Sequence, residues 1–495
     1  MRFNWNSLSK FCDRNFDSII FYIFLIFIMF FRFNFFFAER LWSDEGLYCW
    51  FGKRIFTDPS LIFSKEITSH HPPLFAVFLA LGHIFLPSAL ACHLIPFIFY
   101  GMGIVAIYSL GTRIKNKLVG LFSALILAVN GYYFYYSTFI FIDVPLAVFF
   151  IILAVLLEGI DEDSPPKKHF LLGLWAVLTL LLKSSAIIII PWIFFYYLLS
   201  FNKIPLLERI KKFLMPFSLM SMLILFLSIK NYSQLGGMLP YGPQLSLVHI
   251  KDFGASLRPF IDVIQLPSLW LFIIIGLIAM REIERKKKIL LLSWFFITGA
   301  GIYSISALIE IRFVLLILPS LVIIIALALE KIVVLLAKRN FRFRHFILVV
   351  VLIALFIFSS IFLIPSAREI KKSDKFYVGY YLAGEYVRQM ARPDSLILAG
   401  SERQIRYTSD INFKEYGGQI IAFRQNQEEF EELVQRSSHA ILEIDAWEVL
   451  QPKWAFPVAS PTLNYLGRQG FKIVNIIYSQ SDEMGEIPII YIFER

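Results

Sequence analysis

The sequence predicts a polytopic α-helical membrane protein with a C-terminal α/β domain, and three observations carry this prediction. Hydrophobic residues make up 58% of the 495 residues and charged residues only 17%, which excludes an ordinary soluble protein. The mean hydropathy is +0.67, and long apolar segments alternate with short basic clusters. From Pro365 onward the character changes, and residues 366–495 hold most of the remaining charge.

Eleven apolar segments approach the length that a transmembrane helix needs. They are residues 18–37, 89–111, 118–136, 144–158, 170–182, 186–201, 213–229, 266–280, 289–307, 313–330 and 346–364. One further apolar run, Leu74–Leu86, has only about thirteen residues, which fits a re-entrant or interfacial helix better than a span. The chain is therefore predicted to cross the membrane eleven times.

Basic residues orient these segments through the positive-inside rule. With the N-terminus inside and Leu74–Leu86 not crossing, the inner segments carry 22 Lys or Arg and the outer segments up to Arg312 carry 9. If Leu74–Leu86 crossed, Arg113, Lys115 and Lys117 would lie outside, against the rule. We therefore expect a multi-pass protein of the plasma membrane. The net charge of +10 is explained by topology, so no nucleic-acid partner is expected.

The odd number of spans places the C-terminal domain outside the cell membrane. We expect a membrane domain over residues 1–365, with an outer loop over 38–88, and a soluble α/β domain over 366–495. Runs rich in Ile and Val predict strands at Ser395–Leu398, Ala440–Ile444, Phe471–Tyr478 and Ile487–Phe493. Helices are predicted at Tyr377–Met390, at Glu428–Gln435 with Asn426 as a possible cap, and at Thr462–Arg468 before Gly470.

Ionisable side chains gather at the predicted outer ends of the spans. They are Asp44, Glu45, His70, His71, Asp143, Lys183, Arg258, Glu310 and Arg312. An ionisable group at or inside the membrane boundary is costly, so it is normally paired or functional. Acids and cations at one interface suit a reaction on a lipid-linked phosphate. A carboxylate can take a proton from an attacking hydroxyl, and Lys or Arg can hold the charge of the departing phosphate.

Each of these residues also has a purely structural interpretation. Asp44 and Glu45 can cap a surface helix, although a second isolated acid facing the same compartment favours chemistry. Asp143 stands before Val144-Pro145 and can act as an N-cap, a role compatible with a functional one.

The cations and histidines are open to the same question. Lys183 can snorkel to the interface, and Glu310 and Arg312 can pair with other helices. His70 and His71 precede two prolines, where a histidine is often structural.

The order of the motifs resembles that of the GT-C glycosyltransferases. LWSDEGLY is followed by HHPPLF and then by the lone acid of YYSTFIFID. Within the GT-C group the chain is similar to the protein O-mannosyltransferases and the lipid A aminoarabinose transferases. The likeness extends to GTRIKNKLVGLFSALILAVNGYYFYYS, LLLKSSA and EIRFVLLILPSL, so it covers roughly residues 40 to 330. A GT-C-like fold is thus expected for the membrane domain.

The resemblance implies roles for these residues. The catalytic acid of the family falls on Asp44, with Glu45 beside it, and the second acid matches Asp143. Aminoarabinose transferases have an acid and a lysine before the two prolines, where this chain has His70 and His71.

We assign the remaining candidates from the chemistry they carry. Lys183, Arg312, Arg258 and His71 are candidates for binding the donor phosphate. His70 is the candidate ligand of a divalent metal, should the reaction use one, and no other cofactor is expected.

The resulting interpretation is a membrane glycosyltransferase. It would move a hexose or pentose from a polyprenyl-phosphate donor to a protein, lipid or glycan acceptor on the outer face, and the resemblance implies inversion of the anomeric centre. One alternative is a secondary transporter, but transporters place polar groups near the midplane and show internal repeats, and the sequence shows neither. Another alternative is a membrane-anchored assembly or binding protein, which leaves the clustered acids and cations without a purpose.

Overall fold

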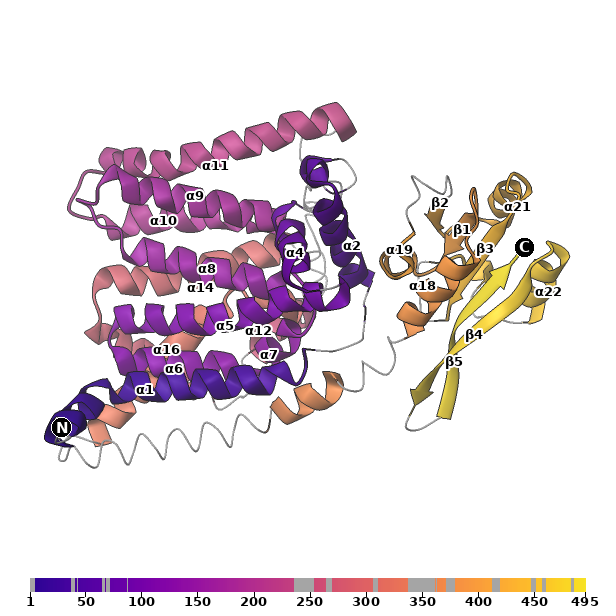
Figure 1. Ribbon diagram of the computed structural model, residues 1–495. Helices are drawn as coiled ribbons and strands as arrows, with labels where there is room; N and C mark the ends of the chain where they lie inside the picture. The colour runs from indigo at the N-terminus through magenta and orange to yellow at the C-terminus, as the bar shows by residue number, and fades with distance from the viewer. Residues whose placement is uncertain are drawn as a thin grey trace. The chain divides into compact units, whose positions relative to one another are not determined.

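The computed structural model describes most of the chain, and it divides into two compact units (Figure 1). The first unit comprises Met1–Phe36, Asp58–Phe78 and His93–Ala367, and the second comprises Phe37–Thr57, Leu79–Cys92 and Arg368–Arg495. The described residues are 5–36, 41, 43–64, 67, 72–86, 88–235, 253–263, 269–305, 310–336, 361, 363–370, 379–411, 419–446, 451–455, 460–481 and 485–495.

The first unit is built from apolar helices that run alongside one another (Figure 1). In chain order these are α1 (Trp5–Phe33), α5 (Ser88–Ile114), α6 (Lys117–Val129), α7 (Gly131–Ser137), α8 (Asp143–Glu158), α9 (Pro166–Leu182), α10 (Ile189–Ser200), α11 (Leu206–Leu235), α12 (Phe253–Asp262), α13 (Leu269–Ala279), α14 (Arg285–Ile305), α15 (Ile311–Val314) and α16 (Leu318–Leu336). Short 3₁₀ turns join some of them: η1 (Pro59–Phe63), η2 (Ser184–Ile188) and η4 (Met280–Glu282).

Close packing in the middle of this unit uses large aromatic rings and small residues. Trp192 of α10 stacks on Trp294 of α14 with ring centroids 5.2 Å apart, and the Trp294 indole donates to the Leu316 carbonyl at 2.9 Å. Both rings are fully buried, and a buried indole N–H usually has a hydrogen-bond partner; Trp294 has one, whereas the buried Trp192 N–H has none among the described residues. At Gly276, α13 touches α16 so closely that a Cβ would lie 2.0 Å from the Ile324 carbonyl oxygen. Any side chain there would push the two helices apart.

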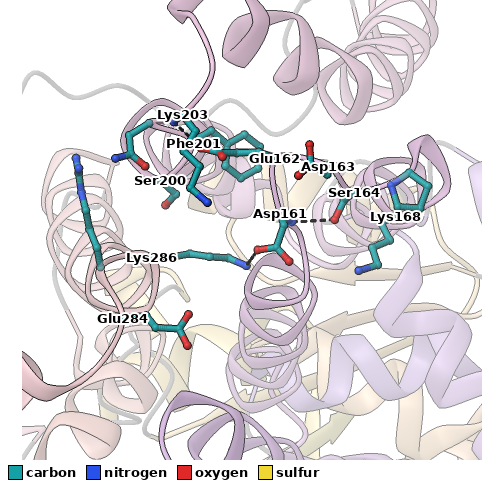
Figure 2. A pocket seen from close by; sticks show the side chains of 13 residues that line it. Asp161, Glu162, Asp163, Ser164, Lys168, Ser200, Phe201, Lys203, Glu284 and Lys286 are labelled. Carbon is teal, nitrogen blue, oxygen red and sulfur yellow. Dashed lines mark hydrogen bonds and ion pairs between the residues drawn. The ribbon is translucent and has the colours of Figure 1, made fainter.

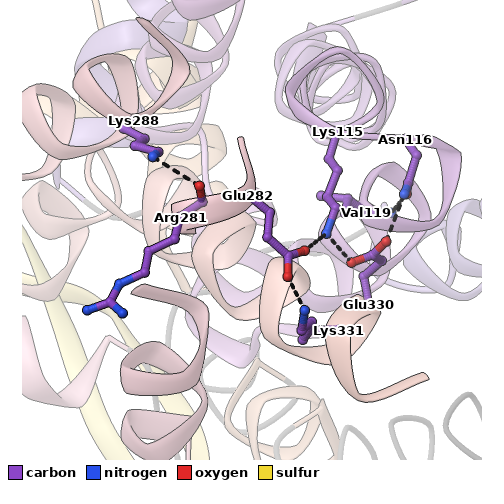
Figure 3. Close-up of polar contacts among 8 residues, drawn as sticks. All are labelled: Lys115, Asn116, Val119, Arg281, Glu282, Lys288, Glu330 and Lys331. Atoms are coloured by element: carbon purple, nitrogen blue, oxygen red, sulfur yellow. Dashed lines mark hydrogen bonds and ion pairs between the residues drawn. The ribbon is translucent and has the colours of Figure 1, made fainter. Parts of the chain in front are cut away.

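Ion pairs tie helix ends together at the side that the charge pattern predicts to be inside (Figure 3). Lys115, which follows α5, lies 2.6 Å from Glu330 of α16 and 3.0 Å from Glu282 of η4. Glu282 also pairs with Lys331, and the Asn116 amide donates to Glu330 at 2.9 Å. The network links segments that are far apart in the sequence. Because several charges take part, we expect it to stabilise the fold more than an isolated surface ion pair would.

Three described helices are long and apolar enough to cross a membrane: Phe16–Phe33, Leu90–Ile114 and Leu318–Leu336. Lys117–Val129 and Gly131–Ser137 together satisfy the same test but are bent by 62°. The other predicted spans that the structure describes coincide with α8 to α11, α13 and α14, and most of these helices are short for a bilayer. The count of eleven spans stays a prediction, and most of the span predicted at 346–364 lies outside the described residues.

Two of the predicted spans are interrupted in the structure. The segment 118–136 breaks at Asn130, whose side-chain oxygen caps α7 by accepting from the Tyr133 amide at 2.9 Å. The Asn130 amide nitrogen donates to the Val263 carbonyl, so the bend is fixed by tertiary contact. The segment 313–330 divides into α15 and α16. The run Leu74–Leu86 forms the single short helix α4 (Leu74–Phe85), as its length predicted.

The second unit contains a five-stranded sheet in the order β2-β1-β3-β5-β4 (Figure 1). The parallel strands are β1 (Leu396–Ala399), β2 (Gln419–Ala422) and β3 (Ala440–Asp445), and the antiparallel pair is β4 (Lys472–Ser481) and β5 (Gly485–Glu494). All six residues of β3 are buried, as expected for a central strand covered on both faces. The helices are α18 (Gly379–Met390), α19 (Glu402–Ser409), α21 (Gln427–Gln435) and α22 (Ser460–Arg468), with the 3₁₀ turn η5 (Lys453–Ala455).

The four strands and three helices predicted for this region all form, within a few residues of the predicted bounds. Asn426 caps α21 in a capping box with Glu429, and Gly470 follows α22 with φ of 89°, a conformation that favours glycine. Strand β2 and helix α19 were not predicted. Helix α2 (Ser43–Thr57) also belongs to this unit.

Candidate functional site

The first unit brings two predicted site residues, Asp143 and Lys183, into direct contact. Asp143 is the first residue of α8, and Lys183 follows the end of α9 in an extended backbone conformation. The Lys183 ammonium lies 2.7 Å from the Asp143 carboxylate, and the two side chains are only 16% and 6% exposed. This is a largely buried ion pair, in which each charge depends on the other.

Arg312 joins this pair through shared aromatic rings. The Lys183 ammonium lies 4.8 Å from the centroid of the Phe313 ring, and the Arg312 guanidinium carbon lies 5.2 Å from the same centroid. Arg312 also lies 5.0 Å from the Phe141 ring, and its Nε is 2.7 Å from Glu310. Stacked against aromatic faces in this way, the two cations are held in place by cation–π attraction as well as by carboxylates.

These contacts bear on the structural interpretations that the sequence left open. Asp143 makes no capping hydrogen bond at the start of α8, because its side chain is directed to Lys183 instead. Lys183 does not snorkel toward solvent, since its ammonium is bound at Asp143. Glu310 and Arg312, two residues apart, pair with each other.

The remaining predicted residues of the first unit are less well placed. Arg258 lies on α12, which packs against the α15 segment that carries Arg312, but its side chain is 81% exposed and pairs with Asp262 on its own helix. His70 and His71 lie outside the described residues. Within the described ranges, no group of three or more His, Cys, Asp or Glu is placed to hold a metal ion. The metal role of His70 therefore stays a prediction.

In the second unit, the acid pair Asp44 and Glu45 occupies the first turn of α2, where negative charge interacts favourably with the helix dipole. Glu45 is fully buried, whereas the Asp44 side chain is 38% exposed and accepts a hydrogen bond from Arg403 of α19 at 2.9 Å. A carboxylate that must meet a substrate hydroxyl needs access from solvent, so Asp44 is the better placed of the two acids.

Sequence reasoning missed two buried or half-buried arginines. Arg403 is one, since nothing in the sequence links α19 to a loop 359 positions earlier. The other is Arg32, near the end of α1, which is 1% exposed and donates to the Ser137 hydroxyl at 3.0 Å and to the Ser137 carbonyl at 2.5 Å. Ser137 ends α7, so Arg32 fixes the start of the connection that leads to Asp143. The sequence could have indicated Arg32, because it is the single cation in the apolar run FFRFNFFF.

A cavity of about 620 Å³ opens elsewhere in the first unit (Figure 2). It is lined by the connections between α8 and α9, between α10 and α11, and between η4 and α14. Lys286 crosses it to Asp161 at 2.6 Å, and Asp161 is bonded to Ser164. None of the predicted site residues that the structure describes lines this cavity.

The chain resembles known proteins at the level of fold. A sequence model of the family described as dolichyl-phosphate-mannose-protein mannosyltransferase matches residues 70–239. ArnT from Cupriavidus metallidurans, solved bound to undecaprenyl phosphate, superposes with a TM-score of 0.63 at 12% identity, over 97% of this chain and 98% of that one. The chain has the fold of the GT-C glycosyltransferases. The resemblance predicted from the motifs is thereby confirmed.

Two more distant structures share the GT-C fold. The oligosaccharyltransferase AglB from Archaeoglobus fulgidus, in complex with an inhibitory peptide and a dolichol-phosphate, gives a TM-score of 0.54 at 13% identity, over 85% of this chain and 69% of that one. Mycobacterial arabinofuranosyltransferase AftD gives 0.54 at 10% identity, over 95% and 41%. No curated protein sequence matches the chain significantly.

Proposed function

We propose that the protein is an inverting glycosyltransferase that moves a hexose or pentose from a polyprenyl-phosphate donor to a protein, lipid or glycan acceptor at the outer face of the membrane. The observation that carries the proposal is the group formed by Asp143, Lys183, Arg312 and Glu310. It is a centre of two cations and two carboxylates built into an apolar helix bundle with the GT-C fold. Such a centre suits a lipid whose only charged part is a phosphate.

The two acids are assigned different roles because their surroundings differ. Asp143 is buried and already bound by Lys183, so it suits a positioning role. Asp44 is half-exposed on α2, so it suits a general base that removes the proton from the acceptor hydroxyl. The hydroxyl oxygen then forms a bond to the anomeric carbon as the bond from that carbon to the phosphate oxygen breaks. A single displacement of this kind inverts the configuration.

The donor phosphate is proposed to leave with its negative charge stabilised by the lysine and arginine of this centre. The Lys183 ammonium has three donors and the Arg312 guanidinium has five, and Lys or Arg can stabilise the charge of a departing phosphate. The known fold supports this assignment, because ArnT was solved bound to undecaprenyl phosphate and AglB in complex with a dolichol-phosphate.

The role of Asp44 is tested with Asp44→Asn. Asparagine keeps the size of aspartate and caps helices about as well, but it does not accept a proton. We expect transfer from a polyprenyl-phosphate-linked sugar to fall on the order of a hundredfold or more, while polyprenyl phosphate binding and the melting temperature stay near those of the wild type. Normal transfer by a folded Asp44→Asn enzyme would refute the assignment and direct attention to Glu45 and Asp143.

A further inference from the structure

Helix α19 of the C-terminal region packs along α2, the helix that carries the candidate base, within one compact unit. The contact is closest at Gly46, where a Cβ would lie 3.0 Å from the Gln404 Cα and 3.1 Å from the Arg403 carbonyl. A larger residue at position 46 would separate the helices. Glycine at this position therefore brings the backbone of Arg403 against the first turn of α2, two residues from Asp44.

Polar contacts follow the same interface from one end to the other. Arg403 donates to the Asp44 carboxylate at 2.9 Å, and the Arg406 guanidinium carbon lies 5.4 Å from the Trp50 ring. At the far end the Lys53 ammonium lies 2.5 Å from Asp410. The contacts advance in the same direction along both helices, so the two helices run parallel and their register is specified at several points.

The position of α19 is itself fixed by the sheet. Ser401, which precedes the helix, donates its amide and its hydroxyl to the buried Glu443 of β3 at 3.0 and 2.8 Å. Arg406 donates to the Ile420 carbonyl of β2, and α19 also packs on α18. A continuous set of contacts thus runs from the centre of the sheet through α19 to the Asp44 carboxylate.

We propose that Arg403 is a positioning residue for Asp44, and that the C-terminal region supplies it. This inference rests on the proposed function, in which Asp44 is the base. By donating from Nη1 to Oδ1, Arg403 restricts rotation of the carboxylate and holds it where a substrate hydroxyl must approach. A misplacement of a reacting group by about 1 Å can cost on the order of a hundredfold in rate, so a restraint of this kind affects turnover directly.

The interface offers a matched control for the test. Arg403→Met removes the donor and keeps much of the length of the side chain, and Lys53→Met removes the other ion pair of the same interface without touching Asp44. Both pairs are partly exposed, so neither substitution should change stability much. We expect Arg403→Met to lower kcat about ten- to a hundredfold with little change in donor KM, and Lys53→Met to stay within about twofold of the wild type.

Two further variants separate positioning from a general structural effect. Arg403→Lys keeps the charge and should recover part of the lost kcat. In an Asp44→Asn background, Arg403→Met should cause no additional loss, because residues that act through one another are not additive. Equal losses in Arg403→Met and Lys53→Met, or a full additional loss in the Asp44→Asn background, would overturn the proposal.

A measurement that does not require transfer distinguishes this inference from the proposed function. The rate at which a water-soluble carbodiimide and an amine modify Asp44, measured by mass spectrometry of the 43–57 peptide, should rise several-fold in Arg403→Met and stay unchanged in Lys53→Met. If the wild-type protein transfers no sugar but this rise is seen, the proposed function fails and the restraint on Asp44 stands. If Asp44 reacts equally in both variants and the wild type, the inference fails whatever the transfer assay shows.

Discussion

Breaking the Asp143–Lys183 ion pair should destabilise the helical unit strongly. The charges are 2.7 Å apart and the side chains are 6% and 16% exposed, so the loss of either partner leaves the other charge in a poorly solvated place. Removing one partner of a buried pair typically costs about 3–5 kcal/mol. We therefore expect both Asp143→Asn and Lys183→Met to lose stability within this range.

The double variant separates the ion pair from the shape of the site. Asp143→Asn combined with Lys183→Met leaves no isolated charge, and replacing both partners of a buried pair is often nearly neutral. The destabilisation of the double variant should therefore be about 2 kcal/mol or more below the sum of the single values. Lys211→Met, which removes an exposed pair with Glu208 on α11, serves as the control and should cost less than about 1 kcal/mol.

The assay is thermal unfolding of detergent-purified protein followed by intrinsic fluorescence. For a domain of 150–250 residues, 1 kcal/mol corresponds to roughly 2–4 °C, and the shift is smaller for a larger domain. The first unit is larger than this, so each single variant should melt on the order of 5 °C lower. Strictly additive losses, or single losses as small as that of Lys211→Met, would refute the view that the two charges depend on each other.

Three other predictions concern the donor, the topology and pH. Arg312→Ala should weaken binding of polyprenyl phosphate and Glu310→Gln should strengthen it, measured on purified protein with Lys211→Ala as control; equal affinities in all three would remove the centre from donor binding. Cysteine labelling should find positions near Lys115 and Lys287 inside and positions near Asp58 and Gln427 outside, and outside labelling near Lys115 would mean that Leu74–Leu86 spans the membrane. The cations Lys331 and Lys115 lower the pKa of Glu282 below its usual value of 4.5, so its contribution to stability is present above pH 4.5 and is lost as pH falls below it. When the pH is lowered from about 6 to about 3, the melting temperature of Glu282→Gln should therefore fall less than that of the wild type. An identical fall in both proteins would contradict this.

The sequence predicted the elements of this protein well because those elements depend on local patterns. Apolar runs predicted most helices of the first unit but not α12, and Ile- and Val-rich runs predicted four of the five described strands. The bend at Asn130 was not predicted, because apolar and aromatic residues continue on both sides of Asn130. The bend also depends on the Val263 carbonyl, which is far along the chain. Helix α19 was not predicted because it is strongly polar, with only Ile405 and Tyr407 as buried apolar side chains.

The candidate site was predicted as a set of residues but not as a set of contacts. Asp143, Lys183 and Arg312 were identified because each interrupts an apolar segment, where a charged side chain is costly and is normally paired or functional. Their grouping depends on how separate helices pack, which no single segment encodes. Arg403 lies in a domain where arginines are common, so its charge carried no signal, and only the close approach at Gly46 shows that it faces Asp44.

The charge balance of the centre limits how it can hold a donor. Lys183 is matched by Asp143 and Arg312 by Glu310, so these four side chains carry no net charge when all are ionised. A phosphate that enters such a group gains little from net electrostatic attraction, and it must compete with the two carboxylates for the donors of Lys183 and Arg312. It binds well only if one carboxylate moves aside. The Glu310 side chain is 40% exposed and Asp143 only 6%, and an exposed carboxylate loses less on being released to water. We therefore expect Glu310 to be the group that gives way, with Asp143 keeping Lys183 in place while Arg312 turns to the phosphate.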